Sequence, residues 1–150
     1  MTDREYARRF ERGDVRNEDF RHKEHLRVAW AYLEEADTED TACAWMRETI
    51  RGFAQANGHP EKFHETITVF WVRLLARVRE AHPHARALED VLGDHPHLLA
   101  KETLFQWYSR ERVTGEAARM AWLEPDLRPL ALHAPRTDPG DPPRDAPHRP

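Results

Sequence analysis

The chain has 150 residues and a formal net charge of −4, from 23 basic and 27 acidic residues. This length suits a single domain with one hydrophobic core. The acidic balance argues against a general nucleic-acid-binding protein, which needs clustered positive charge to displace the counterions of the phosphates. Cys43 is the one cysteine, so the chain cannot form an internal disulfide or a cysteine-based zinc site.

The first residues carry no apolar stretch of the kind found in secretory leaders, and no apolar run approaches the length of a membrane-spanning helix. A free thiol also fits a reducing compartment. We therefore expect a cytoplasmic protein with no membrane partner and no nucleic-acid partner.

Apolar residues recur with helical spacing through most of the chain, and no β-type alternation extends beyond a few residues. Cap and stop residues place the predicted helices in this order: Thr2 to Glu11, closed by Gly13; after Asn17, to about Ala36; after Thr38, to Asn57 and Gly58; Pro60 to about Ala81; Ala85 to Leu92; after Asp94, through Tyr108; and after Thr114. These elements predict an all-α fold, a compact single-domain bundle of about five to six helices.

The C-terminal part has a different composition, because eight of the eleven prolines lie at or after Pro125. We divide the chain into an N-terminal arm or short helix (1–16), a helical bundle (17–124), a segment that could pack as an arm (125–132) and a Pro-rich, disordered tail (133–150). The tail has no apolar periodicity with which to offset the entropy of ordering.

Three histidines lie on predicted apolar faces, with each helical residue advancing about 100°. His22 and His25 share the apolar face of the second predicted helix, one turn apart, and His64 lies in the middle of an apolar arc of the fourth. Two facing helices would bring the three imidazoles together. Three neutral nitrogens on rigid helices, with one position left open, are typical of a catalytic metal site.

We therefore predict that His22, His25 and His64 bind a divalent transition metal. Glu65 would be a further ligand, a partner that orients a histidine, or a general base, and Thr68 would orient a bound water. Tyr32 lies on the same helical face as His25 and could reach the site. Lys101 and Tyr108 could line a pocket. The alternative is that each histidine is a core residue whose ring nitrogens bond neighbouring groups, and the pattern alone does not choose.

Four segments resemble a family of small, all-helical, functionally uncharacterised bacterial proteins: FRHKEHLRVAWAYL (20–33), KFHETITVFWVRLL (62–75), HPHLLAKETLFQWYS (95–109) and WLEPDLRPL (122–130). The family's second motif has a tyrosine where this chain has Phe63. The resemblance implies that the two histidine motifs act together, and it brings no activity, cofactor or substrate.

These observations predict a small enzyme with a histidine-rich, metal-dependent site between two core helices. It would act on a small molecule by hydrolytic or oxidative chemistry. The alternative is a non-catalytic helical interaction or regulatory module, in which the histidines are structural and the Pro-rich tail recruits a protein partner.

Overall fold

The computed structural model describes residues 1–130, and all regular structure in that range is helical. The long helices are α1 (Asp3–Glu11), α2 (His22–Glu35), α3 (Glu39–Ala56) and α4 (Glu65–Ala81). The short ones are α5 (Glu89–Leu92), α6 (Arg110–Thr114) and α7 (Glu116–Met120). Four further segments form 3-10 helices: η1 (Asn17–Asp19), η2 (Pro60–Lys62), η3 (Pro96–Leu99) and η4 (Lys101–Gln106). The predicted all-α class is confirmed.

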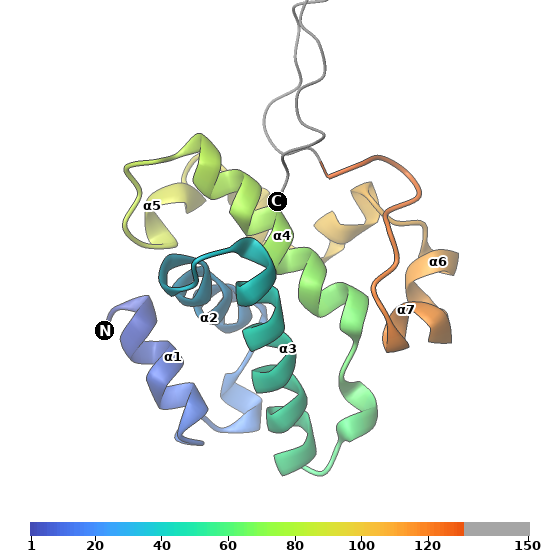
Figure 1. The fold of residues 1–150 in the computed structure, drawn as a ribbon, viewed down its shortest axis with the longest axis horizontal. Helices are drawn as coiled ribbons and strands as arrows, with labels where there is room; N and C mark the ends of the chain where they lie inside the picture. The colour runs from blue at the N-terminus through green and yellow to red at the C-terminus, as the bar shows by residue number, and fades with distance from the viewer. Residues whose placement is uncertain (131–150) are drawn as a thin grey trace, which may run out of the picture.

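Helix α4 is the central element of the bundle (Figure 1). Helices α2 and α3 pack against α4 and against each other, α1 packs on α2, and α7 packs on α4 and α6. The largest side chains sealed in the core are Trp30, Tyr108, Phe70, Leu26 and Met46. Because α1 adds Tyr6, Ala7 and Phe10 to this core, residues 1–16 include a packed helix rather than a loose arm.

Several predicted boundaries are confirmed by their capping geometry. The Thr38 hydroxyl accepts a hydrogen bond from the Thr41 backbone N–H at 3.1 Å and starts α3. At the other end of α3, Gly58 adopts a φ of +77°, which side-chain-bearing residues rarely adopt. The predicted cap of the last helix is wrong: Thr114 is the last residue of α6, and the last helix, α7, begins at Glu116 with Gly115 as its N-cap.

Two boundaries that matter for the histidines lie later in the chain than predicted. The Asn17 and Pro60 segments form only single 3-10 turns, after which the backbone becomes extended at Phe20 and Phe63. Helix α2 therefore begins at His22, and His64 is the N-cap of α4 instead of a residue within it. Apolar spacing cannot distinguish a 3-10 turn followed by a break from the first turn of a longer helix.

The segment that follows α7 packs on the body over its described part, residues 125–130. The Leu127 N–H donates to the Trp107 carbonyl at 2.9 Å, and the Arg128 guanidinium lies 4.2 Å from the centre of the Trp107 ring. The last two residues of the predicted arm and the predicted disordered tail (133–150) lie outside the described residues. Within residues 1–130, no helix is long and apolar enough to span a membrane.

A fully buried threonine holds this C-terminal segment to α4. The Thr66 hydroxyl donates to the Ala121 carbonyl at 2.7 Å and accepts from the Leu123 N–H at 3.1 Å. Thr66→Val keeps the side-chain volume but leaves both backbone groups without this partner. We expect it to lower the free energy of unfolding by about 1–2 kcal/mol in urea titrations. Thr114→Val, at an exposed site, is the control and should cost less than about 0.5 kcal/mol. Equal stability of the two variants would contradict this role for Thr66.

Candidate functional site

His22, His25 and Thr68 line one pocket of about 470 Å³, hereafter the His22–His25 pocket. It lies where the start of α2, the middle of α3, the first half of α4 and η4 meet. Its apolar lining consists of Phe20, Met46, Ile67, Trp71, Leu104 and Phe105, and Arg21, Lys101 and Glu102 complete it with charged groups. The structure thus brings together three of the six predicted site residues.

The His25 imidazole is a polar group of this pocket that has no hydrogen-bond partner among the described residues. Its ring lies against Phe20, with ring centres 4.4 Å apart, and it makes no hydrogen bond with any other described residue. The pKa of His25 is lowered from 6.5 to about 4, mainly by burial and to a smaller extent by the nearby His22 and Lys101. At neutral pH the ring is therefore uncharged, with one N–H donor and one lone pair available.

His22 has a different role in the wall of the pocket. Its Nε2–H donates to the Leu98 carbonyl at 2.9 Å, which ties the start of α2 to η3. The ring also stands edge-on to Trp71, with ring centres 4.5 Å apart. Burial lowers the pKa of His22, so the ring is neutral at pH 7 and only Nδ1 keeps a free lone pair.

Thr68 supplies a second uncommitted polar group. The residue is buried on α4, yet its hydroxyl makes no hydrogen bond with another residue in the described range. It faces the same pocket as His25. A hydroxyl both donates and accepts, so Thr68 and His25 together can bind either kind of hydrogen-bonding group.

The predicted position of His64 is wrong. As the N-cap of α4, its Nδ1 accepts from the Ile67 N–H at 3.1 Å, and its Nε2–H donates to the Val113 carbonyl at 2.8 Å. Both ring nitrogens are therefore used in holding α4 to α6. Among residues 1–130, no group of three or more His, Cys, Asp or Glu side chains could hold a metal ion. Divalent metal binding by His22, His25 and His64 stays a prediction, and His64 would have to give up these two bonds to take part.

Glu65 and Tyr32 also lie away from the pocket. Glu65 is buried in ion pairs with Arg47 and Arg51 of α3, so it links two helices rather than serving as a base beside His25. The Tyr32 hydroxyl donates to Glu11 at 2.5 Å and shares a hydrogen bond with Thr49 at 2.9 Å. Tyr32 lies on the face of α2 predicted for it, but two turns beyond His25, and it lines a different pocket.

Helix η4 contributes pocket residues that the histidine pattern did not indicate, above all Glu102 and Phe105. Lys101 lines the pocket, as the sequence suggested, and its ammonium group makes no ion pair with a described residue. Tyr108 does not line the pocket. Its hydroxyl donates to the Leu123 carbonyl at 2.6 Å. In the sequence, the one feature that could have indicated the η4 wall of the pocket is the charged pair Lys101 and Glu102 next to an apolar run.

The structural role of His64 can be tested apart from ligand binding. His64→Ala removes an N-cap, worth about 1 kcal/mol, and leaves the Val113 carbonyl without its donor. We expect a loss of about 2 kcal/mol in the free energy of unfolding. His64→Asn should restore part of it, because asparagine also caps helices. Thermal or urea unfolding checks this, and wild-type stability of His64→Ala would contradict the assignment.

Comparisons with family models, with curated proteins and with solved structures find no match to this chain.

Proposed function

We propose that the protein binds a small, largely apolar molecule in the His22–His25 pocket, and that His25 and Thr68 contact its polar group. The observation that carries this proposal is the imidazole of His25, which faces an apolar pocket without a hydrogen-bond partner in the described range. The His25 ring is half-buried, and neither of its nitrogens is sealed from solvent without a partner. A ligand group that bonds to the ring would gain a hydrogen bond in an apolar setting, worth about 0.5–1.5 kcal/mol.

The size and lining of the pocket support a ligand of this class. Ligand pockets typically measure about 300–1,000 Å³ and combine apolar walls with a few polar groups. Here six apolar side chains surround His25 and Thr68. Both histidines are neutral at pH 7, and the three charged residues of the lining, Arg21, Lys101 and Glu102, are solvent-exposed. We therefore expect the buried polar group of the ligand to be uncharged, such as a hydroxyl or a carbonyl.

The same residues support the enzyme hypothesis in its metal-free form. Because its pKa is about 4, the neutral imidazole of His25 is a weak proton acceptor at pH 7, so this form requires a substrate whose proton is itself acidic. Thr68 would orient the reacting group. The metal-dependent form of the enzyme hypothesis has less support, because both ring nitrogens of His64 are hydrogen-bonded to the backbone of Ile67 and Val113. The alternative of an interaction module with a recruiting tail concerns residues beyond the described range.

Benzyl alcohol and toluene are matched probes, because they differ only in the hydroxyl group. We expect ¹H–¹⁵N NMR titrations with benzyl alcohol to shift the signals of Thr68 and Phe105 in a saturable way. His25→Leu and Thr68→Val should each weaken benzyl alcohol about fivefold or more, the equivalent of one hydrogen bond. Toluene binding should be unchanged or tighter.

His59→Gln, at an exposed loop position, is the matched control and should bind both probes as the wild type does. Two results would overturn the proposal. In one, benzyl alcohol shifts signals elsewhere in the bundle and leaves the pocket unchanged. In the other, the two variants weaken toluene as strongly as benzyl alcohol, which would mean that only the shape of the pocket matters.

A further inference from the structure

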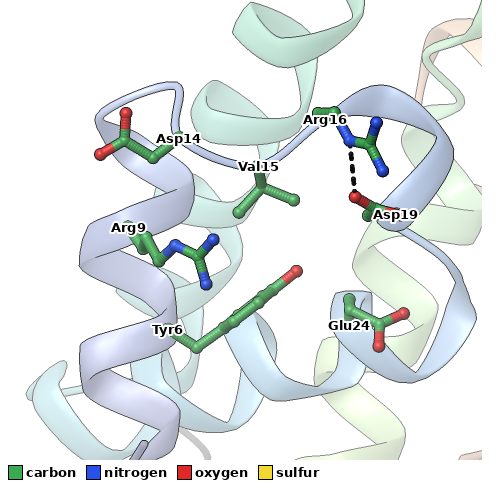
Figure 2. Close-up of a pocket in the computed structure, with 7 residues that line it drawn as sticks. All are labelled: Tyr6, Arg9, Asp14, Val15, Arg16, Asp19 and Glu24. Atoms are coloured by element: carbon green, nitrogen blue, oxygen red, sulfur yellow. Dashed lines mark hydrogen bonds and ion pairs between the residues drawn. The ribbon is translucent and has the colours of Figure 1, made fainter.

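A second pocket, of about 400 Å³, lies between α1, the turn that follows it, η1 and the first turn of α2. Figure 2 shows its lining residues, which are Tyr6, Arg9, Asp14, Val15, Arg16, Asp19 and Glu24. We call it the Tyr6–Arg9 pocket. It shares no lining residue with the His22–His25 pocket, so the two can be tested separately.

The Tyr6 hydroxyl points into this space and has no hydrogen-bond partner within residues 1–130 (Figure 2). The side chain is only 7% exposed, and the Arg27 guanidinium lies 4.8 Å from the centre of its ring. In Figure 2 the hydroxyl lies between Arg9 on one side and Asp19 and Glu24 on the other. No other described residue hydrogen-bonds to it. Burial raises the pKa of Tyr6, so the hydroxyl keeps its proton at neutral pH and can donate it.

Arg9 is a second uncommitted donor in the same place. Its guanidinium extends beside Tyr6 toward the middle of the pocket (Figure 2). It makes no ion pair or hydrogen bond with another described side chain. The neighbouring arginines differ, because Arg12 pairs with Asp14 at 3.3 Å and Arg16 pairs with Asp19 at 2.9 Å.

The opposite side of the pocket carries acceptors. Glu24 uses one carboxylate oxygen, Oε1, to accept the Arg21 N–H at 3.0 Å, and its other oxygen makes no hydrogen bond with a described residue. Asp19 faces the same space and is paired with Arg16. The pocket therefore presents the donors of Arg9 and Tyr6 opposite the carboxylates of Asp19 and Glu24, and the third carboxylate, Asp14, lies on the Arg9 side and pairs with Arg12 (Figure 2).

We propose that the Tyr6–Arg9 pocket binds a small zwitterion of the amino-acid class. The ligand carboxylate would accept hydrogen bonds from Arg9 and Tyr6, and its ammonium group would lie near Glu24 and Asp19. A phosphate dianion fits less well, because the lining holds three carboxylates against two guanidinium groups. A simple cation would leave Arg9 and Tyr6 without partners.

L-Alanine, acetate and inorganic phosphate separate these ligand classes in ¹H–¹⁵N NMR titrations of the full chain. We expect L-alanine to shift the signals of Arg9, Val15 and Glu24 in a saturable way. Acetate should bind with an affinity at least about fivefold lower than that of L-alanine. Arg9→Gln and Tyr6→Phe should each weaken L-alanine about fivefold or more. Arg4→Gln, which removes an arginine of α1 whose partners Glu34 and Glu35 lie outside the lining, should bind L-alanine as the wild type does.

Arg9→Gln should still bind benzyl alcohol normally, so failure of this proposal is distinguishable from failure of the proposed function. The zwitterion site would be overturned by tighter binding of phosphate than of L-alanine, by wild-type L-alanine binding in Arg9→Gln, or by the absence of a saturable shift in residues 6–24. Equal binding of acetate and L-alanine would also overturn it, because the ammonium group would then have no role.

Discussion

Trp30→Ala should lower the free energy of unfolding by about 3–5 kcal/mol, the largest loss we expect from one substitution. Trp30 is completely buried on α2, and the Arg79 guanidinium of α4 lies 5.0 Å from the centre of its ring. Its removal opens a cavity in the α2–α4 contact that supports His22 and His25. Urea unfolding followed by circular dichroism measures the change.

Trp30→Phe is the matched control for this prediction. The indole N–H of Trp30 has no hydrogen-bond partner among the described residues, so phenylalanine removes an unsatisfied donor along with some volume. We expect a cost of about 1–2 kcal/mol, well below that of alanine. A Trp30→Ala protein within about 1 kcal/mol of the wild type would contradict the packing of α2 on α4.

Acidification should destabilise the fold through His25. Its pKa is about 4 in the folded protein and 6.5 when unperturbed, so the unfolded chain takes up the proton first as the pH falls. The stabilising contribution of the neutral ring is therefore complete above about pH 6.5 and is lost progressively toward pH 4. The pKa difference corresponds to a loss of about 3 kcal/mol in the free energy of unfolding. Because the ring faces an open pocket, solvent screening reduces the expected loss to about 2 kcal/mol.

This effect can be isolated by comparing the wild type with His25→Leu. Burial also lowers the pKa values of His22 and His64, so both proteins lose stability in acid through those groups. We expect the wild type to lose about 2 kcal/mol more than His25→Leu between pH 7 and pH 4.5 in urea titrations. Parallel pH profiles would show that His25 is not a buried neutral base.

The sequence predicted the helices better than it predicted the site. Apolar spacing and caps located α1, α3 and most of α2, because these features act over one or two turns. His64 was misplaced because the arc drawn through it assumed a helix from Pro60, whereas α4 begins at Glu65. Tyr32 lies on the predicted face of α2, but two residues on one face can still be far apart along the helix axis. Tyr32 follows His25 by seven residues, which is about 10 Å along a helix.

The wall of the pocket formed by η4 was beyond local pattern analysis. It is placed by long-range contacts such as the hydrogen bond from His22 to Leu98, which joins residues 76 positions apart. His25 and Thr68 meet at the pocket because α2 and α4 pack together, as predicted from their apolar faces. The pairing of the helices could therefore be predicted, but the partners of each imidazole could not.

The most direct test of the account follows the ring ¹H–¹³C NMR signals of the histidines while benzyl alcohol is added at pH 7. The uncommitted His25 ring faces the pocket, so its signal should move in a saturable way. The signal of His64, with both ring nitrogens bonded to the backbone of Ile67 and Val113, should stay in place. A His25 signal that does not respond, or a His64 signal that responds as strongly, would contradict the assignment of the His22–His25 pocket as the binding site.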